Sequence, residues 1–213
     1  MTSPSKKRSK LILARHGESE YNAKGIWTGH LDPDLSEKGK GHAKAIGDAL
    51  KSHGHEVHHA YTSDLTRSRK TWDIAHHHLT NGTKHIPTKD HAALRERNYG
   101  TLNGKNKWEV KEALGDEEFQ KIRRSWDHPI PEGESLKQVY DRTIPYYLAE
   151  IKPLLDAGEN VIAVTHGNTN RALIKYLEDI PDDAVANLEM PHEIVLVYYF
   201  EDGELVEKEI VAL

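Results

Sequence analysis

Cysteine is absent from the 213 residues of this chain. Its absence excludes disulfide bonds, thiolate zinc sites, iron–sulfur clusters and thiol nucleophiles. An excess of positive charge is also missing, because 29 basic and 34 acidic residues leave a formal net charge of −5. Proteins that grip nucleic acids or anionic membranes over a broad surface are basic, so any anion site in this chain must be local.

Long hydrophobic runs are missing as well. The basic residues between Lys6 and Lys10 are not followed by an apolar stretch long enough for a signal peptide or a membrane span. No linker rich in proline, glycine or serine divides the chain. We therefore expect a soluble, cytoplasmic protein with a basic, disordered tail at residues 1–9 and a single domain at residues 10–213.

Short apolar runs alternate with longer amphipathic segments. The runs at residues 11–14, 57–61 and 161–164 are candidate buried strands. This alternation is typical of parallel strands that are linked by crossover helices. The sequence predicts an α/β fold with a mostly parallel central sheet and helices on both of its faces.

Capping residues indicate where the helices begin. Pro145 is expected to kink or restart the helix in which it lies. Residues 194–200 and 205–211 flank Asp202-Gly203, a pattern that predicts a β-hairpin. The expected helix starts are at or next to five polar residues, which are Ser36, Asp64, Asp116, Ser135 and Asn168.

Two of the predicted strands end in the same dipeptide. The first runs into Arg15-His16-Gly17, and the last of the three runs into Thr165-His166-Gly167. Ligands of open α/β sheets bind outside the carboxyl ends of the strands, so two neighbouring strands would bring both imidazoles to one crevice. A glycine after each histidine permits a sharp turn and a close approach of the ligand to the backbone. Two ordinary turn glycines are the alternative interpretation.

The ligand of such a crevice is expected to be an anion and not a metal ion. Arg15 places a permanent cation beside His16, and no acidic residue is close to His166 in the sequence. Arg15 and Arg67 can each form forked hydrogen bonds to phosphate. A neutral, oriented histidine can attack a phosphoryl group, so the pattern predicts phosphohistidine chemistry.

These residues also match a known family. The stretch LARHGES at residues 13–19, followed by Asn22, resembles the signature of the histidine phosphatase superfamily. The wider pattern, from Lys10 to Tyr199, is similar to the cofactor-dependent phosphoglycerate mutases of that superfamily. The elements that carry this closer similarity are YTSDL at 61–65 with Arg67, ERNYG at 96–100, Asn106-Lys107, Arg123-Arg124 and His166-Gly167-Asn168.

The resemblance implies a role for each matching residue. His16 is expected to accept the phosphoryl group, while Arg15, Arg67, Asn22 and His166 hold it. Glu96 matches the residue that gives and takes the proton of the substrate hydroxyl and of the leaving oxygen. The remaining residues of the expected substrate site are Ser19, Thr28, Gly29, Arg97, Tyr99, Lys107, Arg123, Arg124, Gly167 and Asn168.

The activity that the resemblance implies is that of a phosphoglycerate mutase. Such an enzyme interconverts 3-phosphoglycerate and 2-phosphoglycerate in glycolysis and gluconeogenesis, is primed by 2,3-bisphosphoglycerate and uses no metal. Phosphorylated glycerates are then its partners, and residues 10–213 are a single catalytic domain. Two alternatives stay open: a phosphomonoesterase of the same superfamily that transfers the phosphoryl group to water, and a module that only binds phosphorylated ligands.

Three features depart from the mutase pattern. Residues 127–134 are short where many mutases carry an insertion, no long tail follows the last predicted strand, and Asn98 replaces a usual histidine. The first two features bear on assembly and on shielding of the phosphohistidine from water. They predict a monomer or small homo-oligomer with some phosphatase leakage.

Overall fold

The computed structural model describes residues 6–213 of the chain, so residues 1–5 of the predicted tail lie outside the described residues. Within this range the chain forms a six-stranded sheet in the order β3-β2-β4-β1-β5-β6. The first four strands of this order run parallel, and β5 is antiparallel to both of its neighbours, β1 and β6. The strands are β1 (Arg8–Arg15), β2 (His59–Thr62), β3 (Thr88–Asp90), β4 (Val161–Thr165), β5 (Ile194–Glu201) and β6 (Glu204–Ala212).

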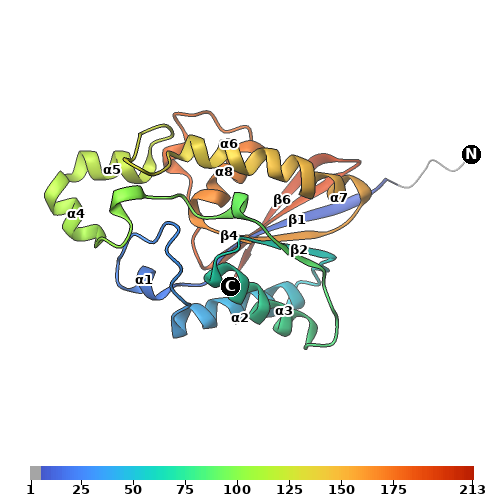
Figure 1. Cartoon of the computed structure of the whole chain (residues 1–213). Helices are drawn as coiled ribbons and strands as arrows, with labels where there is room; N and C mark the ends of the chain where they lie inside the picture. The colour runs from blue at the N-terminus through green and yellow to red at the C-terminus, as the bar shows by residue number, and fades with distance from the viewer. Residues whose placement is uncertain (1–5) are drawn as a thin grey trace, which may run out of the picture.

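Helices cover both faces of the sheet, which confirms the predicted architecture (Figure 1). Leu11 and Leu13 of β1 pack in the cluster under α6, α7 and α8, whereas Ile12 and Ala14 pack under α2 and α3. A strand that is buried on both faces has a continuous apolar sequence, which is why this strand was predictable. The flanking helices are α2 (Glu37–Ser52), α3 (Thr66–Thr80), α6 (Leu136–Tyr146), α7 (Lys152–Ala157) and α8 (Gly167–Leu177).

A smaller group of elements lies beyond the end of the sheet at which β1 finishes (Figure 1). It has an apolar core of its own, which includes Trp27, Tyr99 and Phe119. This core supports the side chains that approach the strand ends from the far side. The helices of the group are α1 (Glu20–Ala23), α4 (Lys107–Leu114) and α5 (Asp116–Arg124).

Two of the predicted helix caps are confirmed in full. The hydroxyl of Ser36 accepts a hydrogen bond from the backbone N–H of Gly39 at 3.0 Å, at the start of α2. Ser135 and Gln138 form a reciprocal capping box at the start of α6. In both cases a side-chain oxygen replaces the carbonyl partner that the first helical amides lack.

Two helix starts differ from the prediction. The helix expected from Asp64 begins at Thr66, because the Asp64 carboxylate pairs with the guanidinium of Arg95 and does not cap the helix amides. The helix expected after Asn168 begins one residue before it, at Gly167. Both shifts are small: α3 begins two residues later than expected, and α8 begins nearer to the end of β4.

Three other features complete the comparison with the sequence. The helix that contains Pro145 continues through a π-helical stretch, Tyr147–Ile151, into α7. The predicted hairpin is present as β5 and β6, with Asp202 and Gly203 at positive φ in its turn. Strand β1 begins at Arg8, so the predicted tail boundary at residue 9 was two residues too late.

No helix within residues 6–213 combines the length and the apolar character that crossing a bilayer requires.

Candidate active site

His16 and His166 meet at the carboxyl ends of two neighbouring strands. Strands β1 and β4 pair in parallel with Arg15 opposite Thr165, and the N–H of His16 donates to the Thr165 carbonyl at 2.8 Å. The centroids of the two imidazole rings lie 4.8 Å apart. The strand adjacency that the site prediction assumed is therefore confirmed.

The geometry around His16 leaves one ring nitrogen free to react. Nδ1 lies 2.6 Å from the carbonyl oxygen of Gly17. Because a carbonyl can only accept, Nδ1 carries the proton and Nε2 keeps its lone pair. Burial and the guanidinium groups of Arg67 and Arg15 hold the pKa of His16 well below its usual range. The ring is thus neutral near pH 7, the form required of a nucleophile.

His166 is oriented from behind by a serine. The Oγ of Ser63 lies 2.6 Å from Nε2 of His166, and its other hydrogen-bond partner among the described residues is a donor, the N–H of Leu65, so Nε2 is the acceptor left for the buried hydroxyl proton. Nδ1 then carries the ring proton, and among the described residues this buried atom has no hydrogen-bond partner. Burial, followed by the charge of Arg67, holds the pKa of His166 well below its usual range. A buried donor without a partner indicates that a bound group completes the site.

A cavity of about 370 Å³ opens at these strand ends. His16 lines this cavity. His166 does not line it and is fully buried. Most of the other residues predicted from the sequence also line the cavity. They are Arg15, Asn22, Thr28, Gly29, Arg67, Glu96, Tyr99, Lys107, Arg123, Arg124, Gly167 and Asn168.

Two predicted substrate residues, Ser19 and Arg97, do not line the cavity. Ser19 caps α1, where its hydroxyl accepts the N–H of Asn22 at 3.1 Å. Arg97 is fully buried, with its guanidinium carbon 4.5 Å from the centroid of the Tyr99 ring and a donor on the Ile122 carbonyl. Both residues support a cavity residue from behind.

Two guanidinium groups near His16 are fixed by backbone carbonyls. Arg67 donates to the carbonyls of Leu31 and Gly29 at 2.8 and 2.9 Å, and Arg15 donates to the carbonyl of Met190 at 3.1 Å. The Nε atoms of both arginines are buried and have no partner among the described residues. Burial lowers the pKa of Arg67 to about 10, so it remains charged near pH 7. These fixed donors are suited to an anion.

A second cationic group faces the first from the smaller apolar core. Nζ of Lys107 lies 5.6 Å from the centroid of the Trp27 ring, and the guanidinium of Arg123 lies 5.4 Å from that of Phe119. Burial, followed by the charges of Arg123 and Arg15, lowers the pKa of Lys107 to about 8. Cations held this close to one another with little solvent are stabilised when an anion binds between them.

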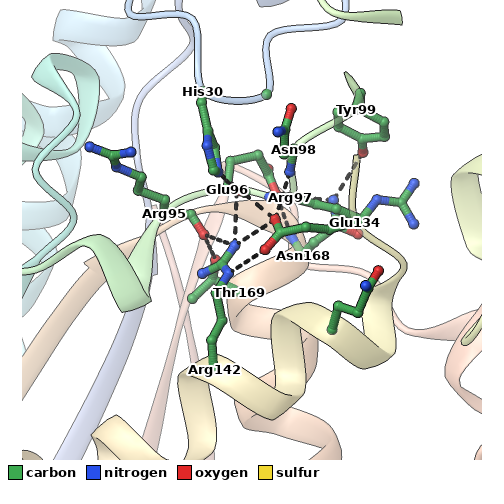
Figure 2. A network of polar contacts seen from close by, with 12 residues as sticks. His30, Arg95, Glu96, Arg97, Asn98, Tyr99, Glu134, Arg142, Asn168 and Thr169 are labelled. Carbon is green, nitrogen blue, oxygen red and sulfur yellow. Dashed lines mark hydrogen bonds and ion pairs between the residues drawn. The ribbon is translucent and has the colours of Figure 1, made fainter. Parts of the chain in front are cut away.

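Glu96 lines the cavity, and its two carboxylate oxygens have different surroundings. Its Oε1 accepts three hydrogen bonds, from the N–H of Arg97 at 2.8 Å and from the N–H and side-chain amide of Asn168 at 3.1 and 3.0 Å (Figure 2). Its Oε2 has no hydrogen bond among the described residues. A carboxyl group held by one oxygen can give or take a proton through the other.

Several further cavity residues belong to no motif found in the sequence. Residues 189–193 line the cavity because they lead into β5, whose antiparallel direction places its start at the strand ends. His192 lies there with its ring centroid 6.0 Å from that of His16, and burial and Arg15 lower its pKa to about 3. Arg171 of α8 donates to the carbonyls of Arg123 and Arg124 at 3.4 and 3.1 Å. The hairpin prediction was the available signal, since it sets the direction of β5.

The fold and the site together define the class of the protein. The family model of the histidine phosphatase superfamily (branch 1) matches residues 11–211, so the chain belongs to this superfamily and is an enzyme. Among the described residues, no three histidine, aspartate or glutamate side chains gather to hold a metal ion.

The similarity to individual relatives extends over most of the chain. A protein of Bradyrhizobium sp. named 2,3-bisphosphoglycerate-dependent phosphoglycerate mutase is 40% identical over 200 residues, which are 94% of this chain and 96% of the relative. The solved structure of YhfR from Bacillus stearothermophilus has a TM-score of 0.78 at 26% identity and covers 93% of this chain and 94% of its own. A mycobacterial glucosyl-3-phosphoglycerate phosphatase shares the fold, with a TM-score of 0.78 at 22% identity over 95% of this chain and 97% of its own.

Proposed function

We propose that the protein is a 2,3-bisphosphoglycerate-dependent phosphoglycerate mutase. The observation that carries this proposal is the presence of two separate cationic groups in one cavity. Arg15 and Arg67 lie near His16, and Lys107 and Arg123 lie on the aromatic core opposite. The phosphate of a phosphorylated glycerate can bind Arg15 and Arg67, and its carboxylate or second phosphate can bind Lys107 and Arg123. A simple phosphomonoester has one anionic group and needs only Arg15 and Arg67.

In the proposed reaction, Nε2 of His16 attacks a phosphorus atom of bound 2,3-bisphosphoglycerate. The bond from phosphorus to the ester oxygen breaks, and its electron pair goes to that oxygen, which receives a proton from Oε2 of Glu96. The free Nε donors of Arg15 and Arg67 and Nδ1–H of His166 are available to the phosphoryl oxygens, over which the transition state spreads its charge.

The return step uses the same residues in reverse. Glu96 takes the proton of the free hydroxyl of a bound phosphoglycerate, and that oxygen receives the phosphoryl group from His16, which forms the bisphosphate again. When it binds, 2,3-bisphosphoglycerate supplies the phosphoryl group that primes His16. The cavity fits such a guest because its cationic walls hold buried donors that the described residues leave unpaired.

A second candidate is a phosphatase of the same superfamily. The observation in its favour is an ion pair between Arg124 and Glu189, both of which line the cavity. This pair engages Arg124, a cavity cation that the sequence also predicts to bind substrate, and adds negative charge to the wall. A mutase substrate would have to displace Glu189 from Arg124, whereas a simple monoester would not.

One assay separates the two activities. The protein is incubated with 3-phosphoglycerate, with and without 2,3-bisphosphoglycerate, while 2-phosphoglycerate and free phosphate are followed. The proposed mutase forms 2-phosphoglycerate, faster with the primer, and releases little phosphate. Release of phosphate without 2-phosphoglycerate would establish the phosphatase. Sedimentation of the same sample tests the proposed monomer or small homo-oligomer.

A further inference from the structure

Arg142 of α6 reaches across to the backbone of the segment that carries Glu96 (Figure 2). Its Nη1 donates to the carbonyl of Ala93 at 2.8 Å. Its Nη2 donates to the carbonyls of Arg95 and Glu96 at 2.9 and 3.0 Å. One guanidinium group therefore binds three carbonyls within four residues, and the last of them belongs to the proposed acid–base residue.

Glu134 holds the guanidinium in place from the opposite side. Its Oε1 accepts from Nε of Arg142 at 2.8 Å, and its Oε2 accepts from Nη2 at 3.1 Å. Although burial opposes ionisation, the hydrogen bond and charge of Arg142 keep the pKa of Glu134 below its usual value. The pair is thus a forked ion pair between two largely buried side chains, the geometry in which arginine is most rigidly held.

The same carboxylate also binds the chain on the far side of Glu96. Its Oε2 accepts the backbone N–H of Asn98 at 2.8 Å. The pair therefore ties down residues on both sides of Glu96, with Arg142 on the carbonyls before it and Glu134 on an amide after it. His30 adds a further contact, since its Nε2 lies 2.9 Å from the Glu96 carbonyl oxygen.

The position of this backbone sets the position of the Glu96 carboxyl group. The three donors on Oε1 come from Arg97 and Asn168, so the carboxyl group bridges its own segment and the start of α8. If the segment moved by an ångström, these bonds and the direction of Oε2 would change together. Proton transfer requires the donor and acceptor atoms to lie within hydrogen-bond distance.

We propose that the Arg142–Glu134 pair is a positioning device for proton transfer by Glu96. The proposal rests on the acid–base role of Glu96 in the proposed function. Neither Arg142 nor Glu134 lines the cavity, so both act only through the backbone that they hold. The alternative is that the pair stabilises the fold without any bearing on the proton.

Two phosphate esters with different leaving groups separate these roles. When a phosphoryl group passes between His16 and a phosphoglycerate, the oxygen involved is that of an alcohol, and Glu96 must give or take its proton. When His16 attacks dinitrophenyl phosphate, a stable phenolate leaves with the electron pair and needs no proton. The value of kcat/KM reports the steps up to departure of the leaving group, so later hydrolysis of the phosphohistidine does not obscure it.

The experiment compares four variants with the unaltered protein on both esters. Arg142→Lys keeps the charge but loses the fork, and Glu134→Gln keeps the shape but loses the charge that orients Arg142. Glu96→Gln removes the acid itself. Glu178→Gln is the matched control, because Glu178 is also a partly buried carboxylate in an ion pair, with Lys208, but is not part of the cavity.

We expect Arg142→Lys and Glu134→Gln to lower kcat/KM for 3-phosphoglycerate by on the order of tenfold or more, with less than about a twofold change for dinitrophenyl phosphate. Glu96→Gln should show the same selectivity more strongly, and Glu178→Gln should show none. Equal losses on both esters in the two pair variants, beside a selective Glu96→Gln, would overturn the positioning role alone. A Glu96→Gln variant without selectivity would overturn the acid–base role and, with it, this proposal. Thermal unfolding of each variant shows whether it is folded, and Glu134→Gln keeps the test decisive if Arg142→Lys does not fold.

Discussion

Gly17 and Gly39 pack backbone against backbone, with no room for a side chain on either residue. A Cβ atom on Gly17 would overlap the carbonyl of Gly39, and one on Gly39 would overlap the carbonyl of Glu18. The first turn of α2 is therefore pressed against the turn that follows His16. Since the Gly17 carbonyl also holds Nδ1 of His16, this contact bears on the orientation of the nucleophile.

Gly39→Ala is expected to destabilise the protein by about 1–3 kcal/mol, because the overlapping atoms belong to backbone that cannot rotate away. The free energy of unfolding in urea measures the effect. Gly41→Ala, in the same helix, is the control: nothing lies within 4 Å of its added Cβ. Helix propensity should make this second variant more stable by about 1 kcal/mol. Equal effects of the two changes would contradict the close-contact argument.

His16→Ala is expected to abolish incorporation of label from radiolabelled 2,3-bisphosphoglycerate. Nε2 of His16 is the ring nitrogen left with a lone pair at the cavity, so no other atom should take its place. Samples quenched in detergent at alkaline pH, where phosphohistidine is stable, and separated by gel filtration measure the bound label. His78→Ala, at a partly exposed histidine that pairs with Asp48 on the protein surface, should label normally. Labelling that persists in His16→Ala would identify a different nucleophile.

The activity should depend on the charge of Lys107 at alkaline pH. Its pKa is lowered to about 8, so the ammonium loses its proton as the pH rises through this value, and its attraction for an anionic substrate is lost. We expect kcat/KM for 3-phosphoglycerate to fall above about pH 8. Lys107→Arg should move the fall to higher pH, because a guanidinium stays protonated. Lys105→Arg, outside the cavity, should leave the profile unchanged.

If Lys107→Arg shows the same alkaline limb as the unaltered protein, another group is responsible for the loss of activity.

The free energy of unfolding is expected to decrease as the pH falls below the ordinary pKa of histidine, about 6.5. His16, His166 and His192 all have lowered pKa values in the folded protein. Below about pH 6.5 the unfolded chain binds protons at these residues while the folded chain does not, so the free energy of unfolding decreases with falling pH. Each fully buried histidine adds a slope of about 1.4 kcal/mol per pH unit. Urea unfolding between about pH 5 and 8 measures the slope, and a flat profile would contradict it.

The parts of the site that follow apolar strands could be predicted from the sequence. A buried parallel strand is a continuous apolar run, and the residue after it must lie at the ligand-binding edge, which places His16 and His166 without any coordinates. Glu96, Lys107 and Arg123 follow no such strand. Their assignment came only from resemblance to a family, because the contacts that fix them join segments distant in the sequence.

Other features depend on competition between partners that no local pattern shows. Asp64 has the residue type of a helix cap, but a forked pair with Arg95 takes its carboxylate. Arg97 lies in a motif of substrate residues, but its guanidinium stacks on Tyr99 and points away from the cavity. The wall at residues 189–193 contains no motif, and it is placed only by the direction of the strand that follows.

The reversed direction of β5 separates two tasks within the chain. The residues proposed to bind and transfer the phosphoryl group follow β1 and β4, and both faces of these strands are buried in the core. The wall with Glu189 and His192 comes before β5, and among its residues Met190 packs in the apolar core, whereas Glu189 does not. Substitution of Glu189 is therefore expected to change which phosphorylated compound the proposed site accepts while the packing of β1 and β4 stays as it is.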